Sequence, residues 1–165
     1  MIGNDRVGMS DRVPYRGRRL RLRSWDYATP AYYFVTICTY RRMPLLGRVT
    51  DGRMRESEAG RIVRRVIDEF ERSEDVLRVF EVVVMPDHVH VILELLPVER
   101  LRTLSGVIGA IKSISARRIN EQLGRTGPVW QRSFADRIIR DEKEFEAAVA
   151  YVRDNPRRWS EKYGP

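Results

Sequence analysis

The sequence predicts an α+β fold in which an antiparallel sheet carries helices on one face and an added helix follows at the C-terminus. Segments rich in β-branched and aromatic residues predict strands at 32–40, 77–85 and 88–96. Apolar residues recur at helical spacing in segments 54–72 and 104–123. With a fourth strand and a last helix, the order is β-α-β-β-α-β-α. Its first six elements match the ferredoxin-like (RRM-like) arrangement.

The elements of the first half are separated by turn-forming residues. Segment 43–53 contains Pro44, Gly47 and Gly52, which predicts a loop or a short hairpin. Pro86 and Asp87 predict a tight turn, so the strands on either side of it form a hairpin. The first helix has an apolar face formed by Ile62, Val63, Val66, Ile67 and Phe70.

The second half is bounded by helix start and stop signals. The second helix is predicted to end near Gly124, and segment 129–139 holds the fourth strand. Asp141 is predicted to be the N-cap of the last helix, with Glu144 three residues later forming a capping box. Pro156 is predicted to close this helix.

Length and composition indicate one domain preceded by a basic arm. The chain has 165 residues, which suits a single domain at residues 25–165, and residues 1–24 predict a flexible arm. The longest apolar runs are too short to cross a bilayer, so no membrane association is expected. The one cysteine, Cys38, has no partner for an internal disulfide, which fits a cytoplasmic protein.

The charge of the chain favours a polyanionic partner. The net charge is +8, and only three of the 31 basic residues are lysine. Residues 1–25 carry seven arginines against two aspartates. Nucleic acid is the most common partner of such a surface. The alternative is an arginine-rich composition whose charges are simply solvated.

The two histidines of the chain stand at positions 88 and 90 of a predicted strand. Residues i and i+2 of a strand point to the same side, so both imidazoles face one surface. Neutral imidazole is a common ligand for divalent metals, and two such ligands need a third from elsewhere. The alternative is a pair of surface histidines without a role, because short motifs often match by chance.

Tyr151 lies at the edge of the apolar face of the last helix. That face is formed by Phe145, Ala148, Val149 and Val152. Tyr151 lies about 110° from its centre, which lets the hydroxyl reach a cleft. Asn155 follows at i+4 and points to the same side. The tyrosine is either an amphipathic packing residue or a nucleophile that loses its proton with the help of a metal or base.

Four segments occur in an order that resembles a known family. They are YFVTICTYRR, VVVMPDHVHVILEL, VWQRSFADRIIRDEKE and YVRDNPRRW, and the similarity covers about residues 18–159. Together they resemble the REP-associated tyrosine transposases, relatives of the single-tyrosine HUH transposases of insertion sequences. The resemblance implies an enzyme that cleaves and rejoins single-stranded, hairpin-associated DNA through a 5′-phosphotyrosine.

The resemblance also implies the roles of individual residues. Tyr151 matches the catalytic tyrosine, His88 and His90 match the two metal-binding histidines, and Asn155 matches a third, carboxamide ligand. Asp87 stands where many relatives have asparagine or glutamate, and no role is assigned to it. The implied metal is Mg²⁺ or Mn²⁺, and Mn²⁺ suits imidazole ligands better.

Basic and aromatic residues are candidates for DNA contacts, because single strands bind to basic grooves and stack on aromatic rings. Trp130 is equally well explained as an anchor of the core. The candidates in the arm, the second helix and the W-Q-R segment are Arg19, Arg21, Arg23, Lys112, Arg117, Arg118, Trp130, Gln131 and Arg132.

Two other functions stay open from the sequence, and a third is disfavoured. One is a metal-dependent nuclease that forms no covalent intermediate, and another is a catalytically silent nucleic-acid-binding protein. An RNA-binding module with the same sheet topology is disfavoured, since its central strands carry exposed aromatic residues where this chain has histidines. The resemblance leaves the oligomeric state between a monomer and a homodimer.

Overall fold

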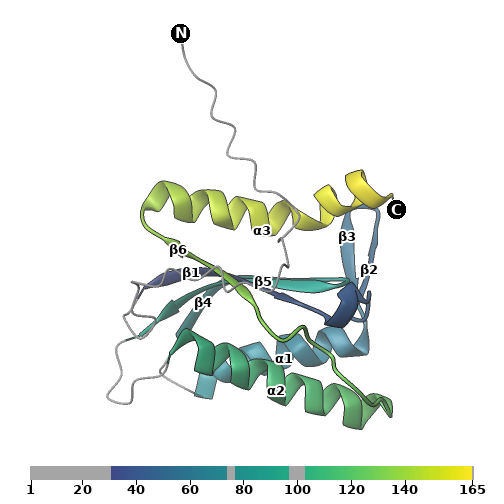
Figure 1. The fold of residues 1–165 in the computed structure, drawn as a ribbon. Helices are drawn as coiled ribbons and strands as arrows, with labels where there is room; N and C mark the ends of the chain where they lie inside the picture. The colour runs from purple at the N-terminus through teal and green to yellow at the C-terminus, as the bar shows by residue number, and fades with distance from the viewer. Residues whose placement is uncertain (1–30, 74–76, 97–102, 165) are drawn as a thin grey trace.

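The computed structural model describes residues 31–73, 77–96 and 103–164. A four-stranded sheet forms the middle layer, with strand order β4-β5-β1-β6 and antiparallel pairing throughout. Helices α1 and α2 cover one face of this sheet, and α3 covers the other (Figure 1). The strands are β1 (Tyr32–Cys38), β4 (Leu77–Met85), β5 (His88–Leu95) and β6 (Ala135–Ile139), and the helices are α1 (Glu58–Ser73), α2 (Leu104–Leu123) and α3 (Glu142–Tyr163).

The alternation of β5 divides the interior into two cores. Val89, Val91 and Leu93 belong to the larger core beneath α1 and α2. His88, His90 and Ile92 therefore lie on the other face of the strand, toward α3. The buried apolar residues of the smaller core on that face are Phe34, Ile92, Ile139, Ala148 and Val152. The ferredoxin-like sheet and the added C-terminal helix are confirmed.

The segment predicted as a loop or short hairpin is a hairpin. Strand β2 (Gly47–Thr50) pairs with β3 (Arg53–Glu56), and we call this pair the β2–β3 ribbon. Asp51 and Gly52 join the strands with φ angles of 52° and 67°, as a two-residue type I′ turn requires. The sequence pattern predicts that the first helix begins at residue 54. Because Arg53–Glu56 is a strand, α1 begins instead at Glu58.

The predicted helix caps are present. The Asp141 side chain accepts a hydrogen bond of 2.8 Å from the backbone N–H of Glu144, so α3 begins where predicted. The second helix ends at Leu123, and Gly124 follows in the left-handed conformation with φ 59°. The fourth strand is shorter than predicted, because only Ala135–Ile139 pairs with β1.

The prediction that Pro156 closes the last helix is wrong. Helix α3 continues through Pro156 to Tyr163. A proline inside a helix removes one backbone hydrogen bond and crowds the preceding turn, but side-chain contacts can hold the helix together beyond it. Here Arg157 pairs with Asp154 on one side of the proline and with Glu161 on the other. The Ser160 hydroxyl accepts a hydrogen bond of 3.1 Å from the Gly52 N–H.

Candidate active site

The four predicted catalytic and metal-binding residues line one pocket between the sheet and α3. His88 and His90 come from β5, whereas Tyr151 and Asn155 come from α3, one turn apart. Thr36 of β1 completes the floor, because it is the register partner of His90. The cavity has a volume of about 40 Å³, and a single water needs about 10–15 Å³ by the same measure. The pocket therefore has room for an ion.

The aromatic rings in the pocket touch one another. The ring centroids of His88 and His90 are 4.6 Å apart, and those of His90 and Tyr151 are 5.5 Å apart. Phe34 packs against both His90 and Tyr151, at 5.1 and 6.0 Å. Trp159 lies 6.0 Å from His88 on the other side. Tyr151 is half-buried, so its predicted place at the edge of the apolar face is confirmed.

Hydrogen bonds fix the orientation of both imidazoles. Nδ1 of His88 lies 2.6 Å from Oδ1 of Asp87, and Nδ1 of His90 lies 2.8 Å from Oγ1 of Thr36. The Nδ1 atoms are therefore engaged with protein partners, and Nε2 is the ring nitrogen that each histidine can offer to a metal. Metal-binding histidines usually have this second hydrogen bond, which sets the tautomer and the ring orientation.

Asp87, for which the sequence indicated no role, connects His88 to a cation. Its second carboxylate oxygen lies 3.0 Å from Nε of Arg42, and Asp87 is 8% exposed. Arg42 also lines the pocket and donates from Nη1 to Sγ of Cys38 at 2.8 Å. The backbone of Arg42 is in the left-handed region, with φ 57°. Such strain in a residue other than glycine is common at functional sites.

Burial controls protonation in and beside the pocket. Burial holds the pKa of His90 well below its usual value, and the nearby charges of His88 and Arg42 act in the same direction. His90 is therefore a neutral imidazole at neutral pH, the form that binds metal. Burial raises the pKa of the Cys38 thiol, against the opposing effect of Arg42. The thiol of Cys38 stays protonated and is not a nucleophile.

The side chain of Asn155 fits the third ligand position. Asn155 is 6% exposed, lines the pocket and forms no side-chain hydrogen bond within the described part of the chain. Buried amides almost always have a partner, so this arrangement suits an ion or a water in the cavity. Among the described residues no three His, Cys, Asp or Glu side chains converge on one point. A three-ligand centre here therefore needs the carboxamide.

The sequence interpretation missed several residues of the pocket because it ended α3 at Pro156. Arg158 and Trp159 follow Tyr151 at i+7 and i+8, and Lys162 follows Asn155 at i+7, which places them on the same side of a continuous helix. The guanidinium carbon of Arg158 lies 5.2 Å from the centre of the Tyr151 ring. Helical spacing alone would have identified these residues if the helix had been extended through the proline.

The chain matches the sequence model of a known family over most of its length. Residues 27–155 match the family described as "Transposase IS200 like". The chain belongs to the IS200-like transposases. The matched range includes His88, His90, Tyr151 and Asn155, whereas the pocket residues of the last turns of α3, from Arg158 onward, lie beyond it in this transposase.

Individual relatives of this transposase are distant. An uncharacterized protein of Haemophilus influenzae is 27% identical over 162 residues, covering 87% of this chain and 90% of that protein. A REP-associated tyrosine transposase solved with a REP hairpin has a TM-score of 0.62 at 23% identity, covering 84% and 74% of the two chains. A candidate transposase of Deinococcus radiodurans R1 has a TM-score of 0.52 at 20% identity, covering 82% and 96%. These likenesses establish the fold.

The basic residues predicted on α2 lie away from the pocket. Helix α2 covers the face of the sheet opposite to α3 (Figure 1). Lys112 donates to the backbone oxygens of Gln131 and Arg132 at 2.7 and 3.0 Å, and Arg118 pairs with Glu69 at 2.8 Å. Arg117 is exposed on the same helix. The structure does not bring these side chains together with the residues of the pocket, and Arg19, Arg21 and Arg23 lie outside the described residues.

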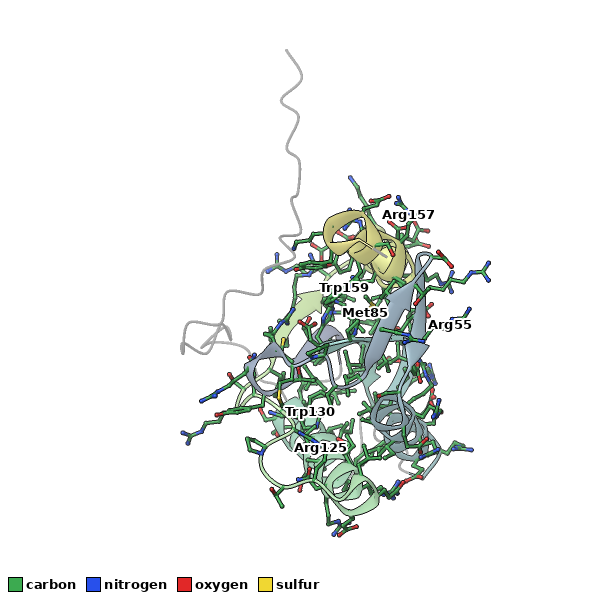
Figure 2. The ribbon with its side chains drawn as sticks, turned by 90° about the vertical axis from the view of Figure 1, so that its right-hand side faces the viewer. Arg55, Met85, Arg125, Trp130, Arg157 and Trp159 are labelled. Atoms are coloured by element: carbon green, nitrogen blue, oxygen red, sulfur yellow. The ribbon has the colours of Figure 1, made fainter. Side chains whose placement is uncertain are left out.

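Trp130 is an anchor of the larger core. Its side chain is 7% exposed, and its indole N–H donates to the hydroxyl of Ser115 at 3.0 Å. Figure 2 shows Trp130 below the sheet with α2, whereas Trp159 lies above it with α3. Of the two explanations that the sequence left open for Trp130, the structure supports core packing. No helix among the described residues is long and apolar enough to span a membrane.

Proposed function

We propose that this transposase cleaves and rejoins single-stranded DNA with Tyr151 as nucleophile and a divalent metal bound by His88, His90 and Asn155. The observation that supports the proposal is that these four residues, from β5 and α3, line one pocket. A phenol beside two oriented imidazoles and a carboxamide suits transesterification of a phosphodiester.

The atoms and bonds of the reaction balance with groups of the protein and the DNA alone. The phenol oxygen of Tyr151 attacks phosphorus and loses its proton, and the bond from phosphorus to the 3′-oxygen breaks. The 3′-oxygen takes up a proton, and the 5′-phosphate stays on Tyr151. Rejoining reverses these steps with an incoming 3′-hydroxyl. The number of phosphoester bonds is conserved, so no nucleotide cofactor is required.

The metal would be Mg²⁺ or Mn²⁺. When bound, such an ion offsets the negative charge of the phosphate and orients it. The residues fit it, since each imidazole offers Nε2 and Asn155 offers a carboxamide oxygen without a protein partner. The two imidazole ligands favour Mn²⁺ over Mg²⁺, which prefers oxygen ligands and water.

Cations at the pocket mouth support a phosphate-containing substrate. Arg42, Arg158 and Lys162 line the cavity. Arg158 lies over the Tyr151 ring, so it places positive charge beside the phenol that becomes negative during proton loss. A fold relative was solved with a REP hairpin, which supports a DNA hairpin as part of the substrate.

The polarity of the covalent adduct tests the proposal. We expect Mn²⁺ and hairpin DNA with single-stranded flanks to yield an adduct that survives denaturing electrophoresis. A label on the 3′ side of the cut should migrate with the protein, and the other fragment should end in a 3′-hydroxyl that a polymerase can extend. Annealing a complementary strand to the flank, which makes it double-stranded, should abolish the adduct.

Other product patterns would contradict the proposal. Adducts that retain the label on the 5′ side would mean a 3′-phosphotyrosine. Cleavage without any adduct, at any time point, would mean that water is the nucleophile and that the protein is a metal-dependent nuclease.

A further inference from the structure

The outer face of the β2–β3 ribbon carries three arginines without counter-charges. Arg48, Arg53 and Arg55 are exposed, and none of their side chains forms an ion pair or hydrogen bond within the described part of the chain. Other exposed arginines do find carboxylates, as Arg153 does with Glu81 at 2.6 Å. Figure 2 shows Arg55 projecting outward from the ribbon.

The pairing register places like charges directly opposite each other. Arg48 is the register partner of Arg55, and Arg53 lies two residues from Arg55 on the same face. Like charges opposite each other destabilise an antiparallel pair. The other face carries Val49 and Met54, which pack against the protein interior. Folding therefore explains the inner face of the ribbon, whereas the charge on the outer face opposes folding.

The tip of the ribbon lies against the helix that carries the catalytic residues. The Gly52 N–H donates to Ser160 on α3, and a side chain at Gly52 would lie 3.7 Å from Cα of Arg157. Arg157 follows Asn155 by two residues, which is a rise of about 3 Å along the helix. The tip of the ribbon thus lies at the pocket end of α3.

We infer that the outer face of the β2–β3 ribbon binds the phosphate backbone of the double-helical stem next to the cleaved single strand. This inference rests on the proposed function, because the proposed substrate joins a stem to a single strand. Three closely spaced guanidiniums match consecutive phosphates. A two-stranded ribbon is also narrow enough to follow a groove of duplex DNA. The pocket holds the scissile phosphate, and the ribbon holds the stem.

The test compares two variants that lose the same charge. In the ribbon variant Arg48, Arg53 and Arg55 are replaced by glutamine. In the control Arg65, Arg72 and Arg78 are replaced by glutamine, since these exposed arginines lie on α1 and at the start of β4. Binding without added metal is measured for a hairpin with its flank and for the flank alone. Thermal unfolding should show that both variants stay folded.

We expect the ribbon variant to bind the hairpin about tenfold more weakly and the flank alone as tightly as the wild type. The slope of log affinity against log salt concentration should fall by about 2–3, since each phosphate contact contributes about 0.9. The control should keep most of its hairpin affinity. An equal loss in both variants, or a loss on the flank alone, would overturn the assignment of the ribbon to the stem.

Adduct formation separates this inference from the proposed function. At saturating hairpin DNA with Mn²⁺, the ribbon variant should reach the adduct yield of the wild type, because its pocket is unchanged. A wild type that forms no adduct would defeat the proposed function. If the wild type forms the adduct and the ribbon variant keeps full affinity for the hairpin, only the inference about the stem is defeated.

Discussion

Replacing Tyr151 by phenylalanine should lower DNA cleavage by about 10³-fold or more and remove the covalent adduct completely. The change deletes one oxygen and keeps the ring that packs against His90 and Phe34. Stability should therefore change by less than about 1 kcal/mol. Mn²⁺ binding and DNA binding should persist, since neither the metal ligands nor the cations of the pocket change. Quantified adduct gels, calorimetry and anisotropy measure the three properties.

Tyr163 provides the matched control for Tyr151. It also lines the pocket, but it is 58% exposed and lies at the end of α3. Tyr163→Phe should cleave within about twofold of the wild type, because a peripheral contact contributes little. Near-normal cleavage by Tyr151→Phe would end the claim that this tyrosine is the nucleophile. Transfer of the adduct to Tyr163 would contradict it equally.

Replacing either histidine by alanine should weaken Mn²⁺ binding by more than about 100-fold, because even losing a residue that only orients a ligand costs about 10–100-fold. Cleavage should fall with metal affinity. Asp87→Asn should give an intermediate loss of about 10–100-fold, since it keeps the size of the residue and removes the carboxylate that orients His88. Isothermal titration with Mn²⁺ measures the series without DNA.

The control for the histidine series is the tyrosine variant. Tyr151→Phe should bind Mn²⁺ like the wild type, so this variant loses cleavage alone, whereas the histidine variants lose metal affinity and cleavage together. Circular dichroism should confirm that the histidine variants stay folded, because both side chains are buried. Equal Mn²⁺ affinity in the wild type and both alanine variants would exclude the histidines as ligands.

The parts of the fold that the sequence predicts are those with local causes. The alternation in β5 separates His88 and His90 from Val89 and Val91, and the N-cap of Asp141 depends on a hydrogen bond to a residue three positions away. Register and helix continuation are different, because they depend on contacts distant in sequence. Thr36 meets His90 across 54 residues, and Gly52 supports α3 beyond Pro156 across 108 residues.

The candidate site was predictable to the extent that its residues share a motif or an element. His88, His90, Tyr151 and Asn155 follow from spacing and from the family resemblance. Arg42 does not, because its place at the pocket depends on a short helical turn with left-handed backbone and on the carboxylate of Asp87. The arginines of α2 lie across the sheet from the pocket, which the sequence did not indicate, since charge alone does not reveal which face of the sheet a helix covers.

The two cores of unequal size have a consequence for hydrogen exchange. Helix α3 is attached to the sheet through a small buried cluster, whereas α1 and α2 share a much larger one. Segments with less buried apolar contact open at a lower free energy than the whole protein unfolds. Amide protons of α3 should therefore exchange before those of α1, as mass spectrometry of labelled peptides can measure. Tyr151 and Asn155 would then leave the pocket together in a partly open state that still keeps the sheet and its two other helices.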